Sequence, residues 1–204
     1  IAQSWSVISR AAAPKRAARA MAALDKYLVR RDDKLLLLFA PPFDHPTRDP
    51  GYIKGYPPGI RENGGQYTHG ALWAVLAFAM QGDGDRAGEL LTMLNPVHHA
   101  GNPNDVHRYK VEPYVICADL YAMPPHTGRG GWTWYTGSAG WLYRAAVEGL
   151  IGIRRKGDRL LIEPSIPAHW EQCSARVRIG EASYQISIER TGRVKARTVE
   201  VDGK

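Results

Sequence analysis

The feature that most constrains the fold is a change in hydrophobic periodicity near residues 152–157. Before this point, apolar residues recur every three or four positions, as in residues 14–30. After it, apolar and polar residues alternate with period two in three segments, 159–167, 175–190 and 193–203. The change predicts a mainly helical part over residues 1–153, followed by an antiparallel β domain over residues 154–204.

The helical part is predicted to contain helices in six segments: 3–10, 14–30, 67–81, 82–96, 112–123 and 138–153. The apolar run at residues 35–43 ends in prolines and predicts a buried strand-like segment. Residues 44–65 form a polar, glycine-rich loop, and loops of this length are uncommon unless they have a function. Helix pairs joined alternately by short turns and long loops suggest a toroid of helices.

Composition excludes several classes of protein. A chain of 204 residues with 44% apolar and 23% charged residues is ordinary for a globular protein. The net charge is +7, but Lys and Arg are scattered and form no dense run of the kind found in nucleic-acid-binding tails. We therefore expect no nucleic-acid partner, and the positive charge instead suits a small anion such as phosphate.

Other local features concern the cellular setting. Cys117 and Cys173 have no metal-binding spacing and predict two buried thiols in a reducing compartment. No apolar run has the length of a membrane span, and the N-terminal residues lack a signal-peptide pattern. The chain has no initiator Met and begins in a predicted helix. We therefore expect a soluble, cytoplasmic piece of a longer protein.

A glycine-rich loop runs from Arg61 into the core helix predicted at residues 67–81. Glu62 precedes two glycines, which would let the backbone approach a ligand closely. His69 would lie in the first helical turn, where an imidazole and free N–H groups together suit an anion. The alternative interpretation is structural: Thr68 caps the helix, and His69 is an ordinary buried residue.

The sequence WTWYTGSAGW, at residues 132–141, brings aromatic residues to the start of a predicted helix. Thr136 and Gly137 would offer free N–H groups, a hydroxyl and a position without Cβ, which together suit a phosphate. The flat faces of Trp134 and Tyr135 suit the C–H surfaces of a sugar. The alternative is a plain N-cap surrounded by aromatic core.

Glu112 is either a ligand for a substrate hydroxyl or a favourable charge at the N-terminus of the helix predicted at residues 112–123. His98, His99 and His107 have no further ligand at metal spacing, so we expect no metal site. Taken together, the three motifs indicate an anion site beside aromatic, hydroxyl-binding walls. This combination is typical of a sugar-phosphate or phosphorolytic pocket.

Three runs of the sequence, GYPPGIRENGGQYTHGALW, YKVEPYV and GRGGWTWYTGSAGWLYR, resemble glycoside hydrolase family 94. This family contains inverting β-glucoside phosphorylases and the C-terminal domain of cyclic β-1,2-glucan synthases. The resemblance extends over residues 2–167 and is finer for the cyclic glucan synthase branch. Ala118 stands where cellobiose-phosphorylase-like members often carry Gln, which speaks against cellobiose as the substrate.

The resemblance implies a fold and a parent protein. Residues 1–153 would be the C-terminal part of an (α/α)6 barrel, and residues 154–204 would be all or part of a β-sandwich-like domain. The chain would then be a fragment of a larger protein, and its partners would include the upstream domains of the same polypeptide. For the parent protein, the resemblance suggests the bacterial inner membrane.

The resemblance also implies roles for single residues. His69, Thr136 and Gly137 match the family's phosphate-binding positions, and Glu62 matches an acidic residue that binds sugar hydroxyls. The other candidates for substrate binding come from the residues themselves: Arg61, Glu112, Trp134 and Tyr135. The family's general acid is an aspartate in the earlier half of the barrel. No segment of this chain resembles the motif around it, so we expect no catalytic residue here.

The implied reaction needs inorganic phosphate as co-substrate, a β-glucan oligosaccharide as substrate and no other cofactor. Phosphate attacks the anomeric carbon and releases α-glucose 1-phosphate with inversion. One alternative is a non-catalytic glucan-binding or scaffold remnant that lacks the acid. Another is a plain inverting hydrolase, which needs a second carboxylate to activate water. Glu112 is the one candidate for that second carboxylate.

Overall fold

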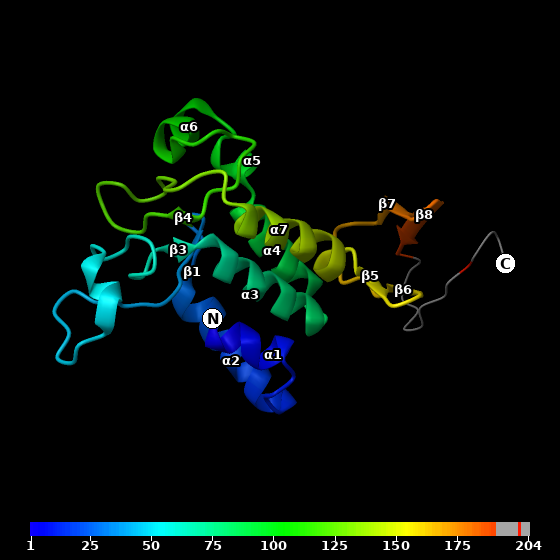
Figure 1. Cartoon of the computed structure of the whole chain (residues 1–204), viewed down its shortest axis with the longest axis horizontal. Coiled ribbons are helices and arrows are strands. Elements are labelled where there is room, and N and C mark those ends of the chain that lie inside the picture. The colour runs from blue at the N-terminus through cyan, green and yellow to red at the C-terminus, as the bar shows by residue number, and fades with distance from the viewer. Residues whose placement is uncertain (191–199, 201–204) are drawn as a thin grey trace. The chain divides into compact units, whose positions relative to one another are not determined.

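Helix α3 (Thr68–Met80) is apolar on nearly all sides and lies at the centre of the longer of two structural units. The computed structural model describes residues 1–190 and residue 200, and it divides the chain into the units Ile1–Pro167 and Ala168–Lys204. Within the longer unit, α3 packs against helices on several sides: α1 (Ala2–Ile8), α4 (Gly84–Leu94), α7 (Thr136–Arg144) and the π-helix η2 (Ala145–Leu150) (Figure 1). This packing confirms the core helix predicted at residues 67–81.

The helices around α3 follow the sequence pattern where one apolar stripe is clear. Helix α2 (Pro14–Leu28) buries Ala17, Met21 and Leu24 on one face, and its first residue is a proline, which needs no N–H partner there. Two short helices were not predicted from the sequence, α5 (Pro96–His99) and α6 (Pro103–Tyr109). Both begin with proline after an asparagine whose side chain caps the helix.

The helix predicted at residues 138–153 is confirmed in part, because α7 starts at Thr136 and continues into η2. Gly149 of η2 lies against Leu76 of α3, so closely that a Cβ atom there would come within 2.9 Å of Leu76 Cδ2. This close approach helps to fix the direction of the α7–η2 segment along α3. The N-terminus of α7 is thereby placed beside the N-terminal turn of α3.

Short antiparallel strands connect the loops of the longer unit. β1 (Val29–Arg30) pairs with β2 (Leu35–Leu36), and β3 (Gln66–Tyr67) pairs with β4 (Asp119–Leu120). The helix predicted at residues 112–123 is therefore wrong: these residues form turns and then β4. Pro113 is followed by Tyr, Val and Ile, which favour extended backbone, and the pairing with β3 selects that conformation.

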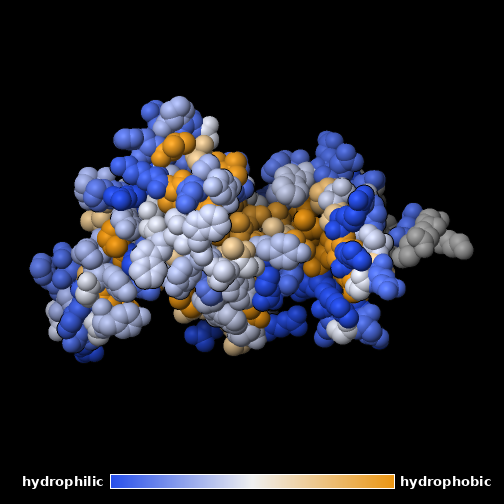
Figure 2. Space-filling model, turned by 45° about the horizontal axis from the view of Figure 1, so that its top comes forward, coloured by the Kyte–Doolittle hydropathy of each residue, from blue (hydrophilic) through white to orange (hydrophobic). Residues whose placement is uncertain are grey.

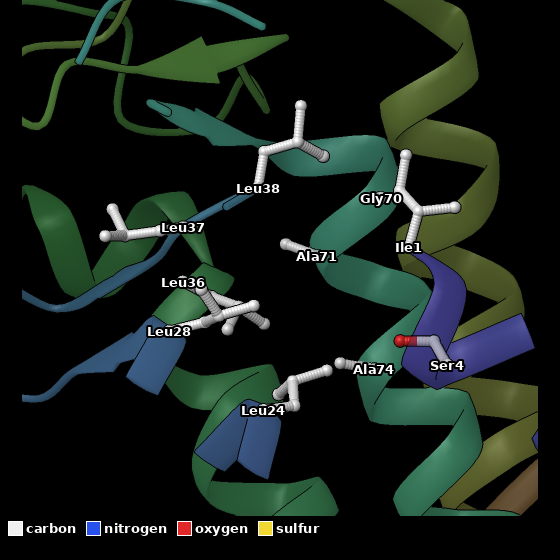
Figure 3. A pocket seen from close by; sticks show the side chains of 10 residues that line it. All are labelled: Ile1, Ser4, Leu24, Leu28, Leu36, Leu37, Leu38, Gly70, Ala71 and Ala74. Atoms are coloured by element: carbon white, nitrogen blue, oxygen red, sulfur yellow. The ribbon is translucent and has the colours of Figure 1, made fainter. Parts of the chain in front are cut away.

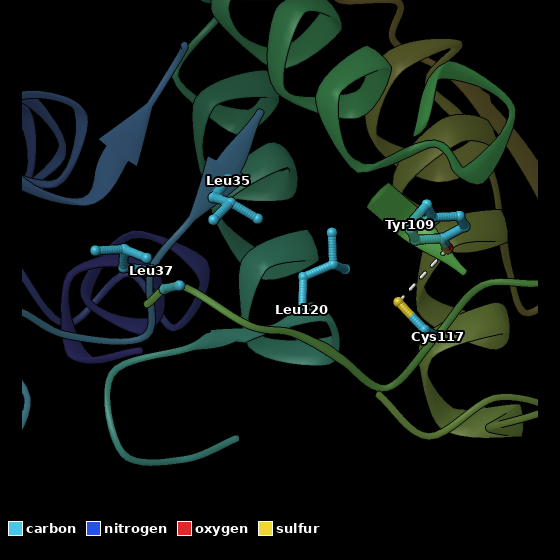
Figure 4. Packing of buried hydrophobic residues seen from close by; sticks show 6 residues of the cluster. Leu35, Leu37, Tyr109, Cys117 and Leu120 are labelled. Atoms are coloured by element: carbon cyan, nitrogen blue, oxygen red, sulfur yellow. Dashed lines mark hydrogen bonds between the residues drawn. The ribbon is translucent and has the colours of Figure 1, made fainter. Parts of the chain in front are cut away.

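A compact cluster of buried side chains supports this region (Figure 4). It consists of Leu35, Leu37, Tyr109, Cys117, Leu120 and Ala122. The hydroxyl of Tyr109 lies 3.5 Å from Cys117 Sγ, and burial raises the pKa of that thiol to about 11. Cys117 is buried as predicted, but Cys173 is only partly buried, and both thiols are free.

A small pocket lies between α1, α2, β2 and α3 (Figure 3). Its lining residues are apolar apart from one serine: Ile1, Ser4, Leu24, Leu28, Leu36, Leu37, Leu38, Gly70, Ala71 and Ala74. A lining of this kind offers few polar groups to fix a ligand. None of the sequence-predicted site residues lines this pocket.

The chain changes from helices to strands at Ile153. In the longer unit, β5 (Ile153–Lys156) pairs with β6 (Arg159–Ile162), which is shorter than the strand predicted at residues 159–167. The second unit, described as far as residue 190 and at residue 200, contains the antiparallel hairpin β7 (Gln172–Ile179) and β8 (Ala182–Glu189). The strand predicted at residues 193–203 lies almost entirely outside the described residues.

The long loop at residues 44–65 contains one short 3-10 helix, η1 (Gly51–Gly55). At its end the chain turns tightly before β3. Gly64 has a φ of +81°, and a Cβ atom on Gly65 would lie 2.9 Å from Arg61 O. Gly65 therefore lets the loop pack on its own backbone, and Gly64 lets it pack on Pro42, whereas the sequence pattern had suggested close approach to a ligand.

Candidate functional site

The strand pair β3–β4 fixes the start of α3. Gln66 pairs with Leu120 and Tyr67 pairs with Asp119, and the N–H of Thr68 donates to Ala118 O over 2.9 Å. The N-cap residue of α3 is Tyr67, which makes no side-chain cap hydrogen bond. Thr68 therefore does not cap the helix, and the structural alternative considered from the sequence does not describe this helix start.

His69 lies in the first turn of α3 among aromatic rings. It stacks on Tyr67, with ring centroids 6.0 Å apart, and contacts Trp73 at 4.7 Å and Trp141 at 5.7 Å. Burial lowers the pKa of His69, so the neutral imidazole predominates at neutral pH. Its Nε2 is buried and has no hydrogen-bond partner in the described part of the chain.

Gly137 of α7 lies directly beside this imidazole. A Cβ atom at Gly137 would lie 3.6 Å from His69 Nδ1, so the absence of a side chain leaves the ring edge open on that side. The main-chain oxygen of the N-cap residue Tyr135 accepts a hydrogen bond from the N–H of Ala139, over 3.2 Å. The N–H groups of Thr136, Gly137 and Ser138 thus precede the helical ladder.

Thr136 is exposed at the first position of α7, and the N-cap residue Tyr135 makes no side-chain cap hydrogen bond. Ser138 is only 1% exposed, and its Oγ has no hydrogen-bond partner among the described residues. The predicted trio His69, Thr136 and Gly137 is therefore brought to one place, where two helix N-termini meet. The plain N-cap proposed as an alternative is absent.

A second group of predicted residues gathers around Arg61. The guanidinium of Arg61 lies over the Trp132 ring, 3.8 Å from its centroid, and Arg61 Nε is 3.7 Å from Glu62 Oε2. That Glu62 oxygen is buried without a hydrogen-bond partner in the described chain. Trp132 in turn contacts Tyr135 at 6.2 Å between ring centroids. The cation and the acid therefore lie beside aromatic faces.

Tyr67 connects the two groups. Its ring stacks on His69, and the charges of Glu62 and Arg61 both act on the pKa of its hydroxyl, which burial raises. The candidate site is therefore continuous, from the Arg61–Glu62 pair through Tyr67 to the junction of His69 and Gly137.

Glu112 and Trp134 form an exposed third group. Trp134 Nε1 donates a hydrogen bond to Glu112 Oε1 over 3.2 Å, and Tyr114 contacts the Trp134 ring at 6.5 Å. Because residues 112–118 form turns, Glu112 does not stabilise a helix N-terminus, which corrects one of the two interpretations made from the sequence. Trp134 is 67% exposed and Tyr114 is 73% exposed, so their rings are open to a ligand.

Exposed aromatic rings are common on this protein. The large side chains with the highest exposure include Tyr27, Tyr52, Tyr114, Trp132, Trp134 and Tyr143. Figure 2 shows pale areas, the colour of intermediate hydropathy, among the blue hydrophilic residues on one face of the molecule. Amphipathic rings of this kind suit the mixed polar and apolar faces of a sugar.

Sequence reasoning missed Asp119, a buried acid close to this site. Asp119 is 1% exposed and lies in β4, and its Oδ1 accepts a hydrogen bond from the N–H of Trp132 over 3.3 Å. A signal was present in the sequence, because Asp119 is the single acid in the apolar run VICADLYA at residues 115–122. Charged residues are rarely fully buried unless they are paired or functional.

Two features of the described residues concern metal binding and membrane insertion. No group of three or more His, Cys, Asp or Glu side chains among them is arranged to hold a metal ion. His99, one of the histidines considered for a metal, is instead buried and stacked on Tyr109, with ring centroids 5.1 Å apart. Among the same residues, no helix is long and apolar enough to cross a membrane.

Comparison with known proteins relates the chain to carbohydrate-active enzymes. It is 52% identical over 202 residues to the cyclic beta-(1,2)-glucan synthase NdvB of Rhizobium meliloti (strain 1021), a match that covers 99% of this chain and 7% of that protein. It is 32% identical over 206 residues to solabiose phosphorylase of Paenibacillus borealis, covering 99% of this chain and 26% of the relative. It is 34% identical over 186 residues to N,N'-diacetylchitobiose phosphorylase of Vibrio furnissii, a match that covers 90% of this chain and 22% of the relative.

The chain thus spans about a quarter of the length of the two phosphorylases and 7% of the length of the glucan synthase. A family model described as the catalytic domain of the glycosyl hydrolase 94 superfamily matches residues 1–152. That match includes the β3–α3 junction, β4 and α7, and so every predicted site residue. The chain therefore belongs to the glycosyl hydrolase 94 superfamily, as its sequence motifs indicated.

Proposed function

We propose that this chain supplies the phosphate side and one sugar wall of a glycoside phosphorylase module. The module performs inverting phosphorolysis of β-linked glucan, with β-1,2 linkages, within a cyclic β-1,2-glucan synthase-like protein. The observation that carries the proposal is the contact between His69 and Gly137 at the meeting point of two helix N-termini. The names of the relatives support the same chemistry, because two of them are phosphorylases and one is a glucan synthase.

The phosphate site in this proposal has three parts. The N–H groups at the start of α7 donate to phosphate oxygens, and the partial positive charge of the helix N-terminus adds to the attraction. The imidazole of His69 donates from the ring nitrogen that faces Gly137. The bare Cα of Gly137 lets a phosphate oxygen approach both donors at once. The hydroxyl of Thr136 supplies a further hydrogen bond.

The chemistry follows from the charge of the nucleophile. A phosphate oxygen forms the new bond to the anomeric carbon of the terminal glucose, while the bond to the departing glycosidic oxygen breaks. The leaving oxygen takes a proton from a general acid, which we place in a part of the polypeptide outside these residues. Phosphate is already an anion, so a site lined with N–H donors replaces the second carboxylate that an inverting hydrolase needs.

The sugar wall consists of the groups on the Arg61–Glu62 side of Tyr67, away from His69. Arg61 donates to sugar hydroxyls, and the carboxylate of Glu62, which is paired with Arg61, accepts from them. The rings of Trp132 and Tyr135 take the apolar face of the sugar. Glu112 and Trp134 extend this wall for further glucose units of the chain.

We further propose that helices α1 to α7 are the C-terminal part of an (α/α)6 barrel and that the chain is one piece of a larger polypeptide. Both statements rest on family membership and on the small share of each relative that the chain covers. The remaining helices of the barrel would then supply the general acid and the other side of the sugar site.

The test is an assay of the full-length polypeptide with linear β-1,2-glucan, in the presence and absence of inorganic phosphate. We expect α-glucose 1-phosphate only when phosphate is present. Reducing sugar without sugar phosphate would identify a hydrolase and overturn the proposal. Binding of glucan without any product would instead identify a non-catalytic glucan-binding module.

A further inference from the structure

Asp119 binds the segment that carries Trp132 through two separate hydrogen bonds. Its side-chain Oδ1 accepts from the N–H of Trp132 over 3.3 Å, and its main-chain oxygen accepts from the N–H of Gly131 over 2.8 Å. The neighbouring Ala118 N–H donates to Trp132 O over 2.6 Å. Strand β4 therefore determines where the backbone of residues 131 and 132 lies.

The position of this carboxyl group leaves no space for a side chain at residue 131, which is a glycine. A Cβ atom at Gly131 would lie 2.4 Å from Asp119 Oδ1 and 2.6 Å from Oδ2, which no side chain can do without displacing the acid. The φ of Gly131 is not in the left-handed region, so the reason for a glycine here is space and not backbone conformation. The turn and the acid fit each other closely.

The hydrogen bond to Trp132 does not by itself explain why this residue is an acid. An asparagine would accept the same hydrogen bond and would bury no charge. Asp119 is 1% exposed, and its Oδ2 has no hydrogen-bond partner among the described residues. Burial raises the pKa of this carboxyl group, so its charged form is costly for the fold. A residue that carries such a cost is a candidate for function.

The charges that act on Asp119 are those of the sugar wall. Besides burial, the charge of Arg61 lowers the pKa of the Asp119 carboxyl group and the charge of Glu62 raises it. The guanidinium of Arg61 lies over the ring of Trp132, whose backbone Asp119 holds. Asp119 therefore acts on both members of the Arg61–Trp132 stack, on one through a hydrogen bond and on the other through charge.

We propose that Asp119 is a positioning residue for the sugar wall: it fixes Trp132 by its backbone and holds the Arg61 guanidinium over the ring. In this arrangement the N–H groups at the guanidinium edge meet the hydroxyls of a neutral glucose unit, with the paired carboxylate of Glu62 beside them. This inference rests on the function proposed above and names the residue that orders its sugar side. It assigns Asp119 no part in phosphate binding.

The test compares three variants of the full-length polypeptide. Asp119→Asn keeps an oxygen acceptor for Trp132 but removes the charge. Asp158→Asn makes the same change at an exposed position in the β5–β6 turn and serves as the matched control. Arg61→Gln removes the group on which Asp119 is proposed to act. Thermal unfolding, the affinity for linear β-1,2-glucan by calorimetry, and the separate KM values for glucan and phosphate are measured for each.

We expect Asp119→Asn to unfold at or above the temperature of the unmodified protein. Its affinity for glucan should fall by about 10- to 30-fold, the range for loss of a charged interaction, with the KM for phosphate within about twofold of the original. In the Arg61→Gln background, Asp119→Asn should cause little further loss of glucan affinity, because each change alone already removes the positioned guanidinium. Asp158→Asn should change neither constant.

Other results would overturn the inference. Unchanged glucan affinity in Asp119→Asn would show that the acid only holds the loop, while the phosphorylase proposal would stand. Fully additive losses with Arg61→Gln, equal losses for glucan and phosphate, or a large fall in unfolding temperature would also contradict it. If the unmodified protein binds no glucan, the proposed substrate and this inference both fail, and the binding measurement shows this without any reference to turnover.

Discussion

Two sets of helix N-termini in the longer unit are built differently. Helices α4, α5 and α6 begin after Asp83, Asn95 and Asn102, whose side-chain oxygens accept hydrogen bonds from backbone N–H groups of the first turn. Helices α3 and α7 begin after Tyr67 and Tyr135, whose side chains make no cap hydrogen bond. The first set is satisfied within the protein, and α7 in particular offers N–H groups to a ligand.

The absence of a cap is not sufficient to define a site. Helix α2 also lacks a side-chain cap, but its first residue, Pro14, has no N–H to satisfy. What distinguishes α3 and α7 is that His69 of one lies against Gly137 of the other. The comparison teaches that a helix start becomes a candidate anion site when a second element closes over it with a matching donor.

The strongest test of this comparison fills the space at Gly137. Gly137→Val should lower kcat/KM for phosphate by about 1,000-fold, a loss comparable to removing an anion-stabilising donor in other enzymes. The branched side chain would occupy the space beside His69 Nδ1. Unfolding temperature should not fall, because valine is a better helix former than glycine.

The matched control for this change is in the same helix. A Cβ atom at Gly140 would meet nothing within 4 Å, so Gly140→Ala should stabilise α7 and leave phosphate kinetics unchanged. If Gly140→Ala and Gly137→Val lost the same activity, the effect would come from the helix as a whole and the phosphate assignment would be wrong.

A second prediction concerns the pH dependence of stability that comes from His99, the buried histidine of the capped helix α5, and not from His69 of the candidate site. Burial lowers the pKa of His99 to about 4, below its value in the unfolded chain, so the fold favours the neutral ring. This stability is fully present above pH 6.5 and is lost as pH falls from 6.5 toward 4, by about 3 kcal/mol in total. Thermal unfolding of the full-length protein across this range measures it.

The variant His99→Gln should flatten that pH dependence, whereas His107→Gln, at an exposed position, should leave it unchanged. Inorganic phosphate should not alter the contribution of His99 to the pH dependence of stability. A steep acid loss that persists in His99→Gln would place the titrating group elsewhere.

A third prediction concerns His69 itself. His69→Ala in the full-length protein should raise the KM for phosphate by about 30-fold, because a donor to an anion is lost. The KM for glucan should change much less, because the sugar wall lies on the other side of Tyr67. Initial rates measured at varied concentrations of each substrate separate the two constants, and equal losses for both would contradict a phosphate role.

The smallest expected effect belongs to the capped helices. Asn102→Ala removes the acceptor for the N–H groups of Asn104 and Asp105 at the start of α6, and it should cost about 1 kcal/mol of stability. Phosphate kinetics should be unaffected, because the N–H groups at this N-terminus already donate to the Asn102 side chain. A change in KM for phosphate would mean that α6 contributes to the site and would end the distinction drawn above.

Much of the fold could be predicted where one pattern dominates. The apolar stripe of α2, the almost wholly apolar α3 and the period-two alternation of residues 175–190 are each recognisable in the sequence because burial follows periodicity. The alternation did not show the turn that divides this segment between β7 and β8. The failure at residues 112–123 has the opposite cause. Short apolar segments fit helix and strand templates equally well, and the pairing of Asp119 with Tyr67 decides between them.

The candidate site divides in the same way. The motifs around Glu62, His69 and Gly137 identified the family and the residue types suited to phosphate and sugar. They could not show that Gly64 and Gly65 serve the packing of the loop, or that Glu112 accepts a hydrogen bond from Trp134. Asp119 escaped notice because a single acid in an apolar run carries no spacing signal.

The sequence by itself determined the family, the order of helices before strands and the residue types at the ends of α3 and α7. Only the tertiary structure decided that Gly137 lies beside His69, that Tyr67 stacks on His69, and that the Asp119 carboxyl group accepts a hydrogen bond from the N–H of Trp132. The physical reason is the separation along the sequence of the residues that make contact. Periodicity and capping depend on neighbours within a few residues, whereas His69 and Gly137 are 68 positions apart, and Asp119 reaches Tyr67, 52 positions away, only through the β3–β4 pair.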